Sequence, residues 1–168
     1  METSPKLGPY NYRFGAIAAG ISIIFSLMLY FMDMTYDQSP VIKAVQMIIP
    51  VAVVIFAIIN FKKDNGGLLS LKQAIKLGTG IFLIAGIIGL FYLAIFINAI
   101  EPDFISKTAQ LQVEVLWETK PELDESIIQL QQDNTEKYFY VSFPFILIVN
   151  VIFGLVTGLI TGLVAKKS

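Results

Sequence analysis

The sequence contains neither cysteine nor histidine among its 168 residues. Without cysteine the chain has no disulfide, no thiolate nucleophile and no ligand for an iron–sulfur cluster. Without histidine it lacks the commonest metal ligand and the one side chain that titrates near neutral pH when unperturbed. Two large classes of enzyme mechanism are therefore excluded before any motif is considered.

Charged residues are also scarce. They make up 15% of the chain, whereas a soluble domain carries about 25%. Hydrophobic residues make up 55%, and the mean hydropathy is +0.70. This composition is typical of a membrane protein, and the net charge of −1 gives no support for nucleic-acid binding.

Four long stretches of the sequence carry almost no charge. Each is long enough to cross a hydrocarbon core of about 30 Å as a helix rising about 1.5 Å per residue. We therefore expect an all-α, multi-pass protein that forms a single membrane domain over 1–168, with the lipid bilayer as its main partner. The predicted spans are about 14–32, 41–61, 77–100 and 139–165.

The N-terminal residues up to Tyr12 contain Pro5, Gly8 and Pro9, which predict a short disordered tail. A cleaved signal peptide is the alternative to a first span. Its apolar core would be about 7–15 residues long and followed by small residues. Here the uncharged run is longer and bulky residues follow it, so a retained span is favoured.

Local signals mark the ends of the second and third spans. Ser39 and Pro40 have the form of an N-cap followed by a proline in the first helical turn. Pro50 removes a backbone donor in mid-span and predicts a kink. The stretch LLSLKQAIKLG before the third span is either an interfacial helical turn or the basic flank of that span.

Residues 101–137 form the long polar segment, and nine acidic residues there outnumber three lysines. Apolar residues recur in it at helical spacing, which predicts two amphipathic helices with a break near Thr119. Thr119 and Glu122 have the spacing of a capping box for the second helix. The first helix is either separate or a continuation of span three bent at Pro102.

The charge distribution predicts the orientation. With the N-terminus inside, the inner segments hold eight of the twelve basic residues and only two of the thirteen acidic ones. The positive-inside rule then places both termini in the cytoplasm and 101–137 outside. The eight inner basic residues are Lys6, Arg13, Lys62, Lys63, Lys72, Lys76, Lys166 and Lys167.

Gly154, Gly158 and Gly162 repeat every fourth residue in the last span, a spacing that lets two helices approach closely in lipid. Their partner is either a second copy of the chain or another span of the same chain. Span one offers Gly15-Ala19 and Ala16-Gly20, and span three offers Ala85-Gly89.

Two polar side chains, Gln46 and Asn150, fall within predicted spans. Each is expected to bond a neighbouring helix rather than a substrate. No catalytic, cofactor-binding or metal-binding motif is recognisable, and no ionisable residue falls near mid-membrane. The outer carboxylates do not follow a calcium-loop pattern, so we expect a solvated acidic face rather than a cation site.

Several stretches together resemble one known family. They are GGLLSLKQAIKLG before span three, EPDF after it, TKPELDES outside, and a glycine-rich last span ending in Lys-Lys. They are similar to the small four-span membrane proteins of Bacteroidota called domain of unknown function 4199. The resemblance implies four helices and a bacterial inner-membrane location, and it supplies no site residues.

Two functional hypotheses remain. The first is a non-enzymatic accessory or scaffolding subunit that acts through helix packing and its acidic outer segment, with another membrane protein or itself as partner. The alternative is a small transporter or channel for a neutral or lipid-like substrate, motivated by Pro50, Gln46 and Asn150.

Overall fold

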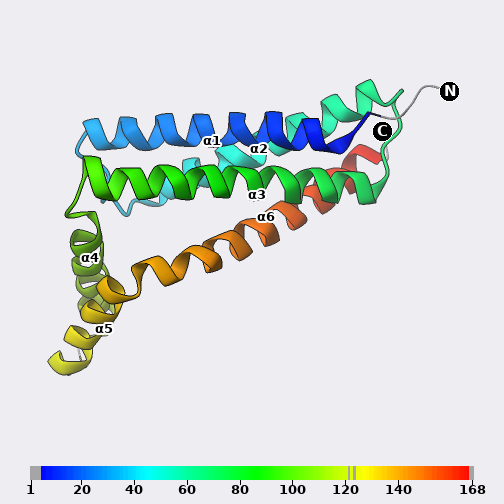
Figure 1. The fold of residues 1–168 in the computed structure, drawn as a ribbon. Helices are drawn as coiled ribbons and strands as arrows, with labels where there is room; N and C mark the ends of the chain where they lie inside the picture. Colours follow the sequence, from blue (N-terminus) through cyan, green and yellow to red (C-terminus); the bar gives the residue numbers. More distant parts are fainter. Residues whose placement is uncertain (1–4, 121, 123, 167–168) are drawn as a thin grey trace. The chain divides into compact units, whose positions relative to one another are not determined.

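The computed structural model of the chain describes residues 5–120, 122 and 124–166. That part of the chain is helical and contains no strand (Figure 1). A π-helical turn, η1 (Phe96–Ile100), extends the third helix, and a 3-10 turn, η2 (Phe139–Val141), precedes the last. The α-helices are α1 (Leu7–Phe31), α2 (Pro40–Asp64), α3 (Leu71–Ile95), α4 (Phe104–Thr119), α5 (Glu125–Lys137) and α6 (Ser142–Lys166).

Within the described residues, four helical segments are long and apolar enough to cross a membrane, which confirms the expected all-helical, multi-pass architecture. They extend beyond the uncharged runs because the flanking polar residues continue the same helices. Lys62 and Lys63, for example, lie in the last turn of α2. The four segments are Leu7–Phe31, Pro40–Asp64, Leu71–Ile100 and Phe139–Lys166.

The chain divides into two compact units, one formed by 1–89 with 146–168 and the other by 90–145. In the first unit, α1 contacts α2 through the rings of Phe14 and Phe56, whose centroids lie 6.2 Å apart. The buried cluster of this unit is apolar. It comprises Phe14, Ala18, Val54, Ala57, Ile58, Phe61, Leu69, Ala74, Leu77, Ile81 and Phe82.

The expectation of a disordered N-terminal tail is wrong from Leu7 onward, because α1 already begins there. Gly8 and Pro9 lie in its first turn, where a backbone N–H has no helical partner and proline is tolerated. Tyr10 also packs its ring against Phe61, with centroids 5.2 Å apart, and its hydroxyl donates to the carboxylate of Asp64. These contacts hold the segment as helix.

The start of α2 follows the sequence signal, since the Ser39 side chain accepts a hydrogen bond from the Ile42 N–H and Pro40 opens the helix. The start of α3 follows a second local signal, in which Gln73 comes three residues after Ser70. The Gln73 N–H donates to Ser70 Oγ at 3.2 Å, and the Ser70 N–H donates to Gln73 Oε1 at 2.8 Å. This reciprocal pair is a capping box, so the basic stretch before span three forms the first turns of α3 itself.

The second unit contains the end of α3, the helices α4 and α5, and the beginning of α6. The two helices predicted for the polar segment 101–137, with a break after Thr119, are observed as α4 and α5. The first is not a bent continuation of span three. The π-helical turn ends at Ile100, and α4 begins only at Phe104, after the non-helical stretch that contains Pro102.

The capping box predicted from Thr119 and Glu122 is also wrong. Thr119 is the last residue of α4, and its hydroxyl donates back to the Val115 carbonyl at 2.7 Å. Asp124 caps α5 instead, by accepting a hydrogen bond from the Ser126 N–H at 2.8 Å. Pro121 and Leu123, between the two helices, lie outside the described residues.

Candidate functional site

The three glycines of the last span lie against α3. A Cβ on Gly154 would lie 2.6 Å from the Gly78 carbonyl oxygen, and a Cβ on Gly158 would lie 2.6 Å from that of Ala74. A Cβ on Gly162 would lie 2.6 Å from the Cβ of Ala74. Real Cβ atoms do not approach other atoms this closely. The backbones of α6 and α3 can therefore touch only because these three positions of α6 carry no side chain.

The contact on α3 differs from the one expected from spacing. Ala74 and Gly78 meet α6, whereas a Cβ added to Gly89 would meet no atom within 4 Å. Gly15 of α1 faces Ile84 of α3 and not α6. The structure therefore assigns the glycine repeat to packing within the chain, against the first turns of α3.

The two amides predicted inside the membrane lie in different environments. Asn150 is half-buried, and its amide donates to the Ile146 carbonyl of its own helix at 2.9 Å. Gln46 is exposed on α2, and Pro50 lies one turn further along that helix, which continues through it. Because Asn150 bonds its own helix and Gln46 is exposed, these placements give no support to a polar pathway through the first unit.

One buried polar atom of the first unit was missed in the sequence. Asn11 lies in α1, where a tail was expected, and its Oδ1 is buried without a hydrogen-bond partner in the described part of the chain. Its Nδ2 donates to the Lys76 carbonyl at 3.5 Å, and its side chain occupies the space beside Gly80. Only the recognition that α1 begins at Leu7 could have placed it among the spans.

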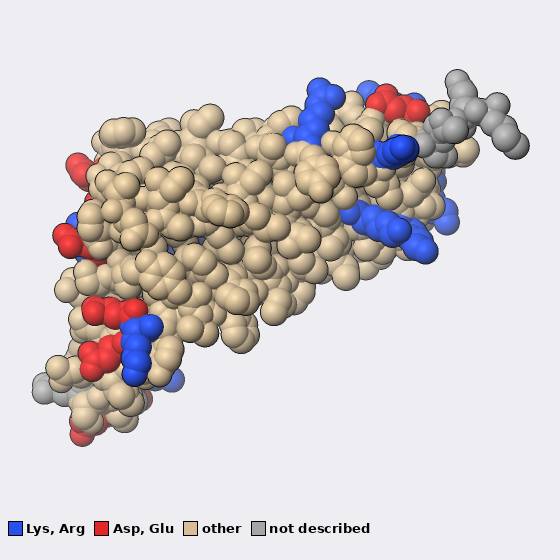
Figure 2. Space-filling view, viewed as in Figure 1, with Lys and Arg blue, Asp and Glu red and all other residues tan. Residues whose placement is uncertain are grey.

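Contacts between helix ends gather the basic residues at one end of the first unit. Lys62 Nζ donates to the Ala165 carbonyl at 2.8 Å, which joins the C-terminal ends of α2 and α6. Tyr10 with Asp64 and Asn11 with Lys76 bring the beginnings of α1 and α3 to the same end. Within this unit the visible face between the helix ends is almost free of charged side chains (Figure 2).

The helices α4 and α5 pack against each other as a hairpin in the second unit. Ala109 and Ile128 are buried, and Thr135 Oγ1 donates across to Gln112 Oε1 at 3.1 Å. Other large apolar residues of these helices remain exposed: Trp117 is 39%, Ile127 50% and Leu130 60% accessible. The hairpin is too small to cover them itself.

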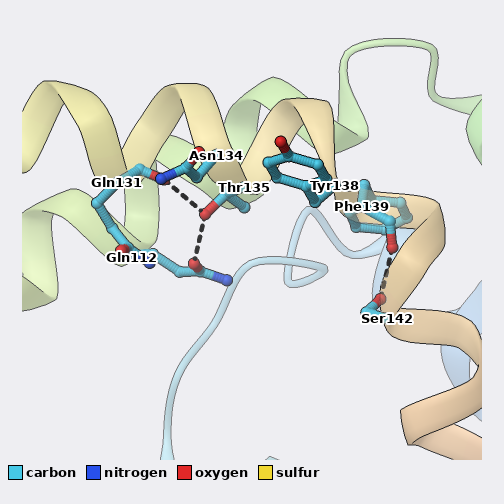
Figure 3. A pocket seen from close by; sticks show the side chains of 7 residues that line it. All are labelled: Gln112, Gln131, Asn134, Thr135, Tyr138, Phe139 and Ser142. Carbon is cyan, nitrogen blue, oxygen red and sulfur yellow. Dashed lines mark hydrogen bonds between the residues drawn. The ribbon is translucent and has the colours of Figure 1, made fainter.

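A pocket of about 370 Å³ lies on this hairpin where α5 leads into η2 and α6 (Figure 3). Its lining is formed by carboxamides, hydroxyls and two aromatic rings, and no Lys, Arg, Asp or Glu belongs to it. All of these residues fall within the second unit. They are Gln112, Gln131, Asn134, Thr135, Tyr138, Phe139 and Ser142.

A known family matches the chain along most of its length. The sequence model of the family described as "Protein of unknown function (DUF4199)" matches residues 13–167. The chain belongs to this family. No curated protein and no solved structure matches it. The family description names no ligand and no reaction.

Among the residues that the structure describes, the carboxylates of the α4–α5 hairpin do not assemble a metal site. Within the described residues, no three Asp or Glu side chains lie close enough together to hold a metal ion. Lys107 of α4 forms an ion pair with Glu101, which precedes that helix. The pKa of Asp124 lies below its ordinary value because the carboxylate accepts hydrogen bonds from Ser126. This carboxylate therefore serves as a helix cap.

Proposed function

We propose that the protein is a non-enzymatic accessory or scaffolding subunit of the bacterial inner membrane, with its α4–α5 hairpin on the extracytoplasmic side. The four apolar helices would anchor it, and the hairpin would bind a partner protein. The observation that carries this proposal is the incomplete burial of the hairpin, which leaves Trp117, Ile127 and Leu130 exposed among carboxylates.

The charge distribution supports the orientation. Lys62, Lys63, Lys72 and Lys76 lie near the end of the first unit at which α1 begins and α6 ends. The hairpin helices carry an excess of carboxylates. A segment rich in lysine is retained on the cytoplasmic side, whereas acidic residues contribute little to orientation. Both termini are then cytoplasmic, and the hairpin is outside.

The chemistry of the hairpin indicates the kind of partner. Ile127 and Leu130 lie three residues apart and so share one face of α5. An exposed apolar face bordered by acidic side chains suits a partner with an apolar patch and a basic rim. Exposed carboxylates on the hairpin include Glu114, Glu118, Glu122, Asp124, Asp133 and Glu136.

Photo-crosslinking in native membranes tests this proposal. A benzoylphenylalanine placed at Leu130 should yield a discrete protein adduct, whereas one at Ile160, exposed on α6 within the last span, should yield lipid adducts. Neutralising Glu114 and Glu118 to glutamine should weaken the Leu130 adduct, and added salt should do the same. The proposal fails if Leu130 gives no protein adduct, or if the adduct is indifferent to both changes.

A further inference from the structure

The pocket on the hairpin is rich in side-chain amides. It presents three carboxamides, from Gln112, Gln131 and Asn134, each able to donate and to accept hydrogen bonds. It carries no formal charge, although Asp133 and Glu136 lie beside it in the sequence of α5. Lys137 lies beside Tyr138 at the edge of the pocket, but neither a cationic side chain nor a carboxylate belongs to the described lining, so a charged ligand of either sign would find no partner of opposite charge there. The lining therefore suits a neutral ligand.

The Thr135 and Ser142 hydroxyls of the pocket form hydrogen bonds to other residues of the lining. The Thr135 hydroxyl lies within hydrogen-bond distance of Gln112 Oε1 and of the Gln131 carbonyl, and the Ser142 hydroxyl donates to the Phe139 carbonyl (Figure 3). In contrast, the side-chain amides of Gln131 and Asn134 make no hydrogen bond to any described residue. Both face solvent and are available to a ligand.

Neighbouring aromatic rings hold the Phe139 side of the pocket in place. The Phe139 ring makes edge contacts with Phe104, Tyr140 and Phe143, at centroid distances of 6.2, 5.9 and 6.0 Å. Tyr138 is 49% exposed, and the Lys137 ammonium lies 5.3 Å from its ring centroid. The lining therefore combines the packed ring of Phe139 and the accessible ring of Tyr138 with the free amides of Gln131 and Asn134.

We propose that this pocket binds a neutral, polyhydroxylated ligand, namely a glycosyl group. The C–H face of a sugar ring would pack against the aromatic side chains, and its hydroxyls, each a donor and an acceptor, would pair with the amides of Gln131 and Asn134. The volume of about 370 Å³ falls at the small end of ligand pockets.

The sugar can come from two sources. Phe139 is the first residue of the fourth helical segment that is long and apolar enough to cross a membrane, so the pocket adjoins the start of that segment. A glycolipid headgroup and a soluble saccharide can both reach a pocket in this position, and both present a glycosyl group. The inference does not depend on a partner protein, because Trp117, Ile127 and Leu130 do not line the pocket.

The test uses the full chain in nanodiscs of phosphatidylethanolamine and phosphatidylglycerol. Maltoside detergents must be avoided, because their headgroups are themselves glycosyl groups. Saturation-transfer NMR with methyl glucoside and methyl galactoside should show transfer from the protein to the sugar C–H protons. Gln131→Ala and Asn134→Ala should each weaken binding roughly fivefold, as expected for one lost hydrogen bond. The control Gln129→Ala, exposed on α5 outside the pocket, should leave binding unchanged.

Two further variants keep the test independent of folding. Tyr138→Phe should retain binding and Tyr138→Leu should reduce it, with equal helicity by circular dichroism. Adding glucosyl diacylglycerol to the nanodiscs should displace the methyl glycoside if the ligand is a lipid headgroup, and should leave it bound if the ligand is soluble. The proposal is overturned if no glycoside binds, if binding survives in Gln131→Ala and Asn134→Ala, or if the neutral amide N-acetylglycine methylamide binds equally well.

Discussion

Gly78 of α3 and Gly154 of α6 lie backbone to backbone, so that each occupies the space in which a side chain on the other would stand. A Cβ on Gly154 would lie 2.6 Å from the Gly78 carbonyl oxygen and 2.8 Å from the Cα of Thr79. In lipid, where apolar surface gains little from burial between helices, this close approach is the main source of contact energy.

Replacement of Gly154 by alanine should therefore separate the two helices. We expect the free energy of unfolding to fall by about 1–3 kcal/mol, the usual cost of overpacking. Denaturant titration of the reconstituted protein measures the change. Gly20→Ala in α1 is the matched control, since its Cβ would meet no atom within 4 Å. Equal stability of the two variants would contradict the packing described.

The Ser70–Gln73 capping box should stabilise the start of α3. Ser70→Ala removes the oxygen that accepts the Gln73 N–H and should cost about 1 kcal/mol. Ser70→Asp keeps an acceptor at the same position and should restore most of the loss. Hydrogen exchange of the first turn of α3 reports the effect locally. An alanine variant with unchanged protection would show that the cap contributes nothing.

Lys62 should stabilise the end of α6, because its ammonium donates to the Ala165 carbonyl at 2.8 Å. Lys62→Met should lower the free energy of unfolding by about 1 kcal/mol and loosen the last turn of α6. Lys63→Met removes the same charge from an exposed neighbour and serves as the control. If both variants behave alike, net charge and not this contact is responsible.

The cap of α5 should depend on pH. The pKa of Asp124 lies below the ordinary value of 3.8 because Ser126 donates hydrogen bonds to the carboxylate. Its contribution to helix stability is thus complete above pH 3.8 and is lost as the pH falls through the lower folded-state pKa. Hydrogen exchange in the first turn of α5 should show this loss, and Asp124→Asn, which caps without titrating, should abolish the pH dependence.

The membrane spans were predictable from sequence because a bilayer selects long apolar helices directly. The start of α1 was not predictable in this way. Gly8 and Pro9 usually indicate a non-helical segment, and they are compatible with a helix here because they lie in its first turn. The contacts of Tyr10 with Phe61 and Asp64 decide this, and they join residues far apart in the chain.

The hairpin shows a second limit. Periodicity correctly predicted two helices, but Ile128 is buried while its neighbour Ile127 is exposed. A rotation of one residue about the helix axis decides which of them faces α4, and the apolar pattern of α5 is too sparse to fix it. The pocket also could not be predicted from the sequence, because Gln112 and Asn134 come from different helices and only the packing of α4 on α5 brings them together.

The side of the membrane on which the hairpin lies is the central claim, and cysteine labelling tests it most directly. The native chain has no cysteine, so a single introduced thiol reports without background. In intact spheroplasts, an impermeant maleimide should label Glu118→Cys in α4 at once. It should label Lys63→Cys only after the membrane is permeabilised. Labelling of Lys63→Cys in intact cells, with Glu118→Cys protected, would contradict the proposed orientation and the extracytoplasmic role of the hairpin.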